Sequence, residues 1–556
     1  MPIPPPTIIW TWGYRKLASI SHAPDLPTNP GCCLSPDFFW PPMTILLAYH
    51  SGTNRPDEST AFRDLLPIGL CSLHALLRTK AIDAHLANLS GMDRSQITSL
   101  FRRIKPKLVG FSQWTHNRHS TLELARLAKQ QLPGCTVVLG GGHATHQAEA
   151  ILAYHPEVDL IVAGEGEETL LALIAALEQG QPLDNVAGLV IRAEGTLVRT
   201  GVRPRIHDLD QLPYPARYLH EAAGVDLELQ TQFISTSRGC PSACRFCASP
   251  TFWGRAVHTR SPASVVEEFL FHRCQFGTLY LSLRDDTFTA DRRRTIELCR
   301  LLSERQVNMF WNCQTRVEAV DEEVLVWMKR AGCECIQLGV ESGSRRLLQL
   351  LGKRITPEQV ITACDAVHRV GLQLSVYLIA GIPGETTEDN RATKELLRRI
   401  APHDLQVAPL AYYPGTSLFS DALRHQQVAA DLFESSREEA LLVMADGNRR
   451  TARLLNGTAN LAPQLNSRTI ATLKQRIGYC AVTCMQAGDH YLQRGDWRRA
   501  EAEYGEITVT QPDHPWGWLL LAELYDQIGR PGQARSCYRR LLDLVPRHPQ
   551  ALMRCT

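Results

Sequence analysis

The chain has 556 residues, 44% of them hydrophobic and 21% charged, which is the composition of a globular protein too long for a single hydrophobic core. Its net charge of +2, from 59 basic and 57 acidic residues, lacks the concentrated positive charge that nucleic-acid backbones require. No apolar run approaches the ~18 residues of a membrane span. We therefore expect about three domains, with neither a nucleic-acid nor a membrane partner. Seventeen scattered cysteines predict reduced thiols and a cytoplasmic location.

The amino-terminal segment is rich in proline: residues 1–42 hold 10 of the 33 prolines. The segment lacks the basic start and apolar run of a signal peptide. Met43 then opens "MTILLAYHSG", which predicts a first strand. We interpret residues 1–42 as an extension that is either disordered or the product of a mis-called start, and we assign it no function.

Residues 43–204 alternate short apolar runs with amphipathic stretches, which predicts a first α/β domain. Four runs predict strands: "ILLAY" and those within residues 107–112, 136–142 and 158–168. Val/Ile/Leu runs that end in glycine are typical of parallel strands buried on both faces, with ligand-binding loops at their carboxyl ends. A ligand is therefore expected over two glycine loops, which contain Gly140, Gly141, Gly142, Gly164 and Gly166.

A second series of strand–helix units follows a linker. Residues 205–232 contain prolines and lose the hydrophobic periodicity, as linkers do. The candidate strands over residues 233–430 are 233–237, 278–283, 309–314, 334–340, 373–379 and 405–413. Six such units predict a partial (β/α)6 TIM-type barrel whose chemistry lies on the loops after the strands.

The carboxyl-terminal part predicts helices, first over residues 431–485 and then as a repeat over 486–556. Five residue pairs are each 34 positions apart: Tyr491/Tyr525, Gly495/Gly529, Ala500/Ala534, Tyr504/Tyr538 and Pro512/Pro546. This is the tetratricopeptide period, and two such repeats must pack on neighbouring helices or on the barrel. We expect Trp497, Trp516 and Trp518 to be exposed. The tail then either docks a protein partner or caps the barrel.

A cysteine motif, "RGCPSACRFCASP", follows the first barrel strand and contains Cys240, Cys244 and Cys247. A structural zinc site requires four ligands, and His258 is only a weak candidate for the fourth. A [4Fe–4S] cluster held by three thiolates leaves one iron open for a substrate. We favour the cluster over zinc and over inert thiols.

This motif, with Phe246 before its last cysteine, resembles the CxxxCxxC hallmark of the radical S-adenosylmethionine superfamily. Later loops resemble that family's loops in the same order: "RDDTF" (284–288), "TR" (315–316), "GVESGS" (339–344) and "AGIPGET" (380–386). The resemblance implies that the three cysteines hold the cluster and that its open iron binds S-adenosylmethionine. A reductant such as ferredoxin or flavodoxin would then supply the electron that yields a 5′-deoxyadenosyl radical.

The same resemblance implies further contacts to S-adenosylmethionine. Asp286 and Glu341 become candidates for contacts to its amino group or ribose, and the Gly381–Glu385 loop for its adenine side. The alternatives are a loop cap for Asp285 or Asp286 and a barrel salt bridge for Glu341.

Residues 140–170 resemble the cobalamin-binding domain that precedes the barrel in one class of this superfamily. A generic dinucleotide domain would show GxGxxG after its first strand, and "AYHSGTNRP" does not. The resemblance implies that His143 and the glycines before it line the nucleotide tail. The DxHxxG signature of histidine-ligated members is missing, so His50 is either a cobalt ligand or a surface residue. We interpret His116 and His119 as surface residues.

The expected fold is α/β: a Rossmann-like cobalamin-binding domain, a partial radical S-adenosylmethionine barrel and a helical tetratricopeptide tail. The resemblance implies a cobalamin-dependent enzyme that methylates an unactivated carbon of a small-molecule or natural-product substrate. The first alternative is radical oxidation, cyclisation or ring contraction without methyl transfer. The second is a non-catalytic adaptor with a vestigial barrel, although the intact cysteine motif argues against it.

Overall fold

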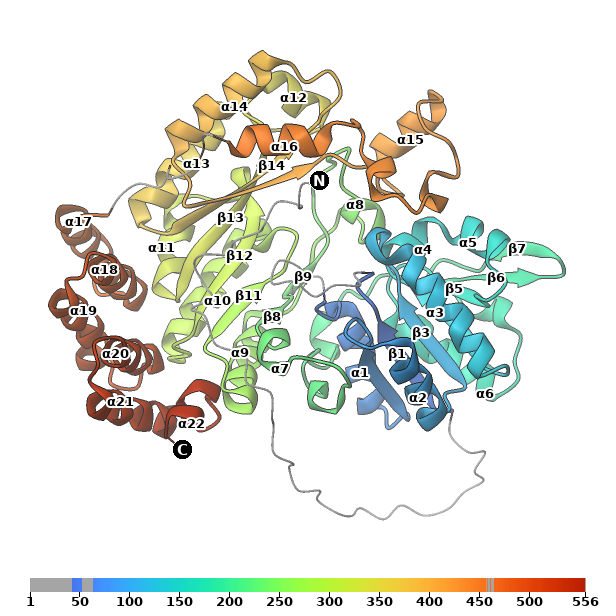
Figure 1. The fold of residues 1–556 in the computed structure, drawn as a ribbon, viewed down its shortest axis with the longest axis horizontal. Helices are drawn as coiled ribbons and strands as arrows, with labels where there is room; N and C mark the ends of the chain where they lie inside the picture. Colours follow the sequence, from blue (N-terminus) through green and yellow to red (C-terminus); the bar gives the residue numbers. More distant parts are fainter. Residues whose placement is uncertain (1–42, 53–63, 457, 459–460, 462–464, 556) are drawn as a thin grey trace, which may run out of the picture.

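A computed structural model describes residues 43–52, 64–456, 458, 461 and 465–555. The prediction for residues 1–42 lies outside these residues. The chain forms an amino-terminal α/β domain, a barrel-like sheet with outer helices, and a helical tail along the side of the barrel (Figure 1).

The amino-terminal sheet has the strand order β2-β1-β3-β4-β5-β6-β7 over the described residues. Its parallel strands are β1 (Ile45–Tyr49), β2 (Ala84–Asn88), β3 (Leu108–Ser112), β4 (Thr136–Gly140) and β5 (Leu160–Val162). Two antiparallel strands, β6 (Leu189–Ala193) and β7 (Thr196–Arg199), complete the sheet. The chain order reverses between β1 and β3, so the loops after these strands open a ligand crevice.

Helices cover both faces of this sheet, which is why every residue of the central strands β1 and β3 is buried. One core includes side chains of α2 (Arg94–Ile104), α3 (Arg118–Gln131) and α5 (Ala148–Tyr154). The other includes side chains of α1 (Ile68–Thr79) and α6 (Glu167–Glu178).

The prediction of four strands in this domain was incomplete. Strand β2 reads "AHLAN", and its exposed His85 interrupts the apolar pattern that identified the other strands. The β6–β7 hairpin lies at the edge, and all residues of β7 are at least partly exposed. The predicted linker also joins this domain, because Ala223 pairs with Ala87 beside β2 and Leu219 lies in the core.

The second sheet is parallel throughout, with the order β15-β14-β13-β12-β11-β8 in the described part of the chain. The strands are β8 (Phe233–Ile234), β11 (Tyr280–Leu283), β12 (Phe310–Arg316), β13 (Cys333–Glu341), β14 (Gln373–Ala380) and β15 (Asp404–Pro409). Strands β8 and β15 do not pair with each other, so the barrel is partial, as predicted. Its larger helices are α9 (Pro262–Phe276), α10 (Arg292–Glu304), α11 (Glu322–Arg330), α13 (Pro357–Val370) and α14 (Thr387–Ile400).

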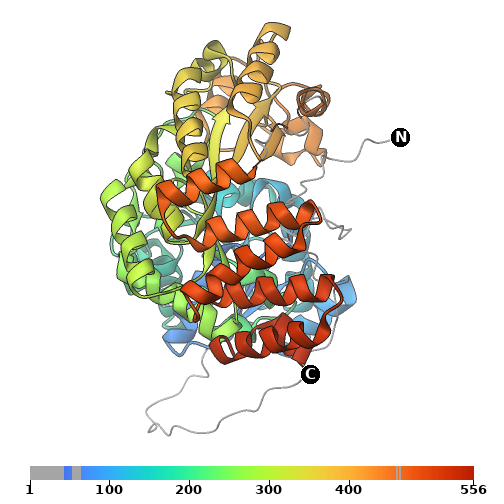
Figure 2. The same cartoon turned by 90° about the vertical axis from the view of Figure 1, so that its left-hand side faces the viewer.

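The helical tail consists of α17 (Ser467–Ile477), α18 (Ala481–Gln493), α19 (Trp497–Thr510), α20 (Pro515–Gln527), α21 (Pro531–Leu544) and α22 (Pro549–Cys555). These helices stack across one side of the molecule (Figure 2). The first helices of the two repeats, α18 and α20, begin 34 residues apart. None of the helices in the described residues is long and apolar enough to cross a bilayer.

The tail packs on the amino-terminal ends of the barrel strands. The Trp516 indole donates to the Leu279 carbonyl at 3.0 Å and stacks on Phe310 with ring centroids 4.6 Å apart. Buried Lys329 of α11 donates to Gln486 of α18 at 3.1 Å. The prediction of exposed tryptophans was therefore wrong: Trp497, Trp516 and Trp518 are half-buried and pack against the core that the tail shares with the barrel.

Candidate functional site

The cysteine motif lies in a long loop that a short hairpin closes. Strand β9 (Ser237–Arg238) pairs with β10 (His258–Thr259), so the residues between them project from the carboxyl end of the barrel. Cys240 and Cys244 are buried and Cys247 is half-buried, and all three are free thiols. The motif is thus held at the face where barrel enzymes carry their chemistry.

The three cysteines line a cavity of about 200 Å³, which we call the cluster cavity. Its other walls include Phe246, Asp286, Gln314, Thr315, Arg316, Gln337, Glu341, Lys353 and Tyr377. One Arg316 nitrogen lies 3.5 Å from the Cys244 sulfur, and the Thr287 hydroxyl lies 3.4 Å from the Cys240 sulfur. Burial raises the pKa of the Cys247 thiol to about 11, so a cationic metal centre is needed to favour its thiolate.

This donor set fits an iron–sulfur cluster better than a zinc ion. Zinc–sulfur bonds of ~2.3 Å in a tetrahedron place the sulfurs about 3.8 Å apart. Among the described residues, the three cysteines do not form a group with ligand atoms within 4.8 Å of one another. His258, the weak candidate for a fourth zinc ligand, is absent from the described lining residues and lies against His207, with ring centroids 4.7 Å apart.

Glu341 reaches the cluster cavity through an irregularity in the sheet. The register between β13 and β14 shifts between Gly339 and Glu341, and Glu341 has a φ of 68°. A bulge of this kind re-aims a side chain. Glu341 accepts a hydrogen bond from Lys353 at 2.9 Å, and both side chains are buried. The barrel salt bridge considered as an alternative is therefore present, and it lies in the cavity wall.

The two neighbouring aspartates have different surroundings. Asp285 is fully buried and accepts hydrogen bonds from the backbone of Thr236 at 2.6 Å and of Ser237 at 3.1 Å, so it caps the loop after β8. Asp286 accepts from the Ser249 hydroxyl, and burial raises the pKa of its carboxyl group. Asp286 lines both the cluster cavity and a second, larger cavity.

That second cavity, the interdomain cavity, has a volume of about 370 Å³ and lies between the two α/β domains. Strand-end residues of the amino-terminal sheet form one wall, and barrel residues that include Arg238 and Asp286 form the other. The glycines that line it are Gly69, Gly110, Gly140, Gly141, Gly164 and Gly166.

Close packing acts on two of these glycines, most strongly on Gly141, whose neighbour is backbone. A Cβ at Gly110 would lie 2.9 Å from the Leu47 side chain. Gly141 has a φ of 98°, and a Cβ there would lie 2.7 Å from the Gln113 carbonyl. The lining is largely apolar and glycine-rich, which suits a bulky organic cofactor such as cobalamin.

Both predicted glycine loops reach this cavity, but the two residues that follow Gly141 in the first loop do not. Gly142 is absent from the described lining residues and packs near Trp114, which lines the cavity and which sequence reasoning missed. His143 is also absent from them. It is buried, lies 3.1 Å from the Thr115 hydroxyl and meets Phe433 edge-on at 5.3 Å. Burial lowers the pKa of His143 to about 3.

The described residues that line the interdomain cavity include no histidine. His50 accepts a hydrogen bond from the Gly52 backbone at 2.9 Å, and burial lowers its pKa. His116 is exposed, as expected. His119 is half-buried and donates to the Ser435 carbonyl at 2.8 Å, so its interpretation as a surface residue was wrong.

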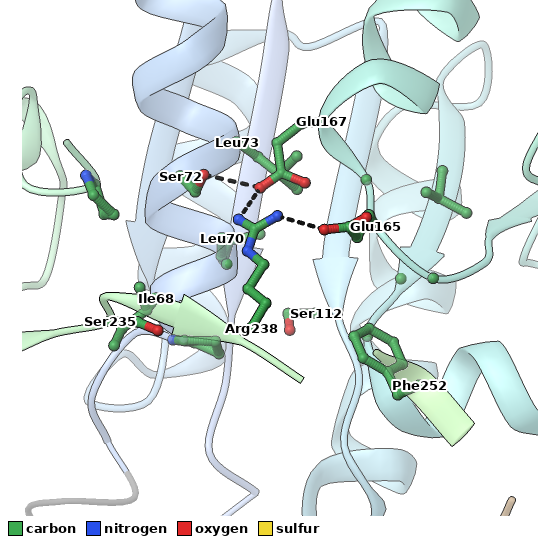
Figure 3. Close-up of a pocket in the computed structure, with 18 of the residues that line it drawn as sticks. Ile68, Leu70, Ser72, Leu73, Ser112, Glu165, Glu167, Ser235, Arg238 and Phe252 are labelled. Carbon is green, nitrogen blue, oxygen red and sulfur yellow. Dashed lines mark hydrogen bonds and ion pairs between the residues drawn. The ribbon is translucent and has the colours of Figure 1, made fainter. Parts of the chain in front are cut away.

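A buried ion pair joins the two domains beside the interdomain cavity (Figure 3). Arg238, two residues before Cys240, donates to Glu165 at 2.9 Å and to Glu167 at 2.6 Å. Ser72 of α1 donates to the same Glu167 carboxylate at 2.9 Å. The second glycine loop is therefore tied directly to the cysteine loop. Sequence reasoning missed this link, although Arg238 lies next to the cysteine motif and Glu167 lies next to the second glycine loop.

The residues of the Gly381–Glu385 loop are absent from the described lining of the cluster cavity. The Gly381 backbone donates to the Glu385 carboxylate at 2.8 Å, and Arg450 of α16 (Gly447–Leu455) lies 3.8 Å from that carboxylate. The contact to adenine that the resemblance implies for this loop stays a prediction.

Family models match the chain in the order of its domains. The radical SAM superfamily model matches residues 234–397, the B12 binding domain model residues 59–174, and a tetratricopeptide repeat model residues 491–553. The chain is also 31% identical over 366 residues to an uncharacterized methyltransferase from Pyrococcus horikoshii, across 64% of this chain and 78% of that relative. The chain belongs to the radical S-adenosylmethionine superfamily, in the class that carries a B12-binding domain.

Another relative of this radical S-adenosylmethionine enzyme is named for a different reaction. The chain is 29% identical over 352 residues to the anaerobic magnesium-protoporphyrin IX monomethyl ester cyclase of Rubrivivax gelatinosus, across 61% of this chain and 62% of the cyclase. The fold is shared with TsrM, a radical S-adenosylmethionine methyltransferase from Kitasatospora setae, solved with cobalamin and a [4Fe–4S] cluster. The TM-score is 0.59 at 17% identity, covering 83% of this chain and 99% of TsrM.

These comparisons confirm the predicted family and fold class. The cofactors are a [4Fe–4S] cluster, S-adenosylmethionine and cobalamin. The chain is therefore a cobalamin-dependent radical S-adenosylmethionine enzyme, and the adaptor with a vestigial barrel is no longer needed as an explanation.

Proposed function

We propose that this enzyme transfers a methyl group from S-adenosylmethionine to an unactivated carbon of a small-molecule or natural-product substrate. The observation that carries the proposal is that Asp286 lines both the cluster cavity and the interdomain cavity. A substrate at this junction would face both cofactor sites. When bound, cobalamin supplies the methyl group, and the cluster with S-adenosylmethionine supplies the radical that removes a substrate hydrogen.

The residues of this chain would hold and shape the site. We propose that Cys240, Cys244 and Cys247 hold the cluster. The buried Glu341–Lys353 pair presents a carboxylate and an ammonium group to the cluster cavity, and these match the amino and carboxylate groups of S-adenosylmethionine. The largely apolar lining of the interdomain cavity suits a radical, because a site with less water around it allows fewer side reactions.

We propose that Asp286 positions the substrate at the junction of the two cavities. Because burial raises the pKa of its carboxyl group, Asp286 is suited to a hydrogen bond with a polar substrate group. Asp286→Asn should keep the iron content of the wild type and lower product formation. Asp285→Asn is the matched comparison, and it should instead destabilise the loop after β8 that Asp285 caps.

The test of methyl transfer is the fate of a labelled methyl group. With methyl-deuterated S-adenosylmethionine and a reductant such as flavodoxin, the product should carry the label, and S-adenosylhomocysteine and 5′-deoxyadenosine should form in equal amounts. The cyclase relative supports the second candidate, radical oxidation or cyclisation. An unlabelled product, with 5′-deoxyadenosine but no matching S-adenosylhomocysteine, would overturn methyl transfer in favour of that candidate.

A further inference from the structure

Gln337 places a buried amide inside the barrel, in the wall of the cluster cavity. It lies on β13 between Ile336 and Leu338, which belong to the hydrophobic core that the barrel sheet forms with its outer helices. Because successive strand residues point to opposite faces of a sheet, the Gln337 side chain points into the barrel. There it lines the cluster cavity and is only 1% exposed.

One end of the Gln337 amide has a partner and the other does not. Its oxygen Oε1 accepts a hydrogen bond from the Tyr377 hydroxyl of β14 at 3.0 Å. Burial raises the pKa of Tyr377 to about 12, so this hydroxyl keeps its proton at neutral pH and can donate it. The buried amide nitrogen Nε2 has no hydrogen-bond partner among the described residues. Such a group is an exception, because most buried polar atoms of side chains are paired and an unpaired donor is costly.

The next inward position of β13 leaves room above this amide. Gly339 also lines the cluster cavity and has no side chain to cover Gln337. A Cβ at Gly339 would lie 2.8 Å from a carboxylate oxygen of Glu341 and 3.0 Å from the ammonium nitrogen of Lys353. The buried Glu341–Lys353 pair therefore lies one inward position from Gln337, and the same ligand can reach both.

The ligand that we place in this cavity carries the acceptors that Nε2 lacks. S-adenosylmethionine has oxygen atoms on its carboxylate group and on its ribose. When bound beside the Glu341–Lys353 pair, it either places one of these oxygens against Nε2 or leaves a buried donor unpaired. The first arrangement is the more stable one.

We propose that Gln337 is a binding residue for S-adenosylmethionine, in which Nε2 donates a hydrogen bond to an oxygen of the ligand and Tyr377 holds the amide in the required orientation. The inference rests on the placement of the cluster and S-adenosylmethionine in the cluster cavity under the proposed function. It does not depend on methyl transfer.

Anaerobic isothermal titration calorimetry with S-adenosylmethionine tests the proposal on the full chain, loaded with the cluster and hydroxocobalamin. Without a reductant the ligand is not cleaved, so the titration measures binding alone. Gln337→Met keeps the length of the side chain and removes Nε2, so it should raise the Kd about three- to tenfold at unchanged iron content. Gln349→Met, at an exposed position of α12 (Arg345–Leu350), is the matched control and should bind like the wild type.

A double variant separates the lost contact from damage to the cavity wall. Gln337→Met also removes the oxygen that accepts from Tyr377, whereas Gln337→Met combined with Tyr377→Phe removes both ends of that bond. The double variant should bind at least as weakly as Gln337→Met. Recovery toward the wild-type Kd would show that the unpaired hydroxyl caused the loss, and it would overturn the proposal. If Gln337→Met does not fold, the comparison of the double variant with Tyr377→Phe gives the same measurement, and equal Kd values there overturn the proposal.

The remaining outcomes separate this inference from the proposed function. A wild-type Kd in Gln337→Met would mean that solvent satisfies the amide, which overturns the role of Gln337 and leaves methyl transfer to its own test. A wild-type chain with a full cluster that does not bind S-adenosylmethionine would overturn both the placement of the ligand and the role of Gln337. An unlabelled product, together with weaker binding in Gln337→Met, would overturn methyl transfer alone and support the contact.

Discussion

The buried ion pair of Arg238 with Glu165 and Glu167 should control how firmly the cysteine loop is held to the amino-terminal domain. The side chains of these residues are 14%, 6% and 4% exposed. Arg238→Met keeps an apolar stem but leaves two buried carboxylates without their cation. Breaking a buried pair in this way costs about 3–5 kcal/mol, which corresponds to roughly 150- to 5,000-fold more frequent opening of this contact.

Hydrogen–deuterium exchange is the suitable assay, because global unfolding of a chain with several domains is not two-state. Arg238→Met should speed amide exchange in the segment from β5 to the start of α6, while exchange in α20 stays unchanged. Arg305→Met is the matched control: Arg305 lies at the same 2.9 Å from Glu267, but both side chains are about half exposed. An exposed pair contributes only about 0–1 kcal/mol.

A triple variant separates lost pairing from lost packing. Arg238→Met combined with Glu165→Gln and Glu167→Gln removes the uncompensated charge, so exchange should slow again toward the wild-type rate. The reasoning is refuted if Arg238→Met exchanges like the wild type, or if the triple variant is no slower than the single one.

Three further predictions concern the cofactors and the tail. Anaerobic reconstitution should give about four irons and four sulfides per chain, and Cys244→Ala should lose them; one equivalent of zinc without iron would contradict the cluster assignment. The described lining of the interdomain cavity lacks histidine, so we expect that no histidine coordinates cobalt. Electron paramagnetic resonance of bound cob(II)alamin should therefore show no nitrogen superhyperfine splitting. A splitting that disappears in His50→Ala would disprove the absence of a histidine ligand. Deletion of residues 481–556 should give an insoluble protein, because the deletion exposes the apolar base of the barrel around Phe310. A soluble and fully active truncated protein would instead indicate that the tail serves only to dock a partner.

The sequence was sufficient where local pattern determines structure. Long apolar runs placed all the barrel strands, and the 34-residue period placed the paired helices of the tail. Strand β2 was missed because tertiary pairing with β1, and not its own pattern, makes "AHLAN" a strand.

The candidate site was predictable where residues act through a contiguous motif, as the three cysteines and the two glycine loops do. The rest depends on contacts that local sequence does not encode. Arg238 and Glu167 are 71 residues apart and meet only because two domains pack together. Glu341 reaches the cluster cavity through a bulge, which shifts its side chain from the position that simple alternation gives.

The most direct test of the central claim is the formation of 5′-deoxyadenosine by the reduced, reconstituted chain, which needs no knowledge of the substrate. The wild type should release 5′-deoxyadenosine slowly from S-adenosylmethionine, because the cluster can cleave this ligand without a substrate present. Cys244→Ala should release none. A wild-type chain that holds about four irons and makes no 5′-deoxyadenosine, or a Cys244→Ala chain that makes as much as the wild type, would contradict the account.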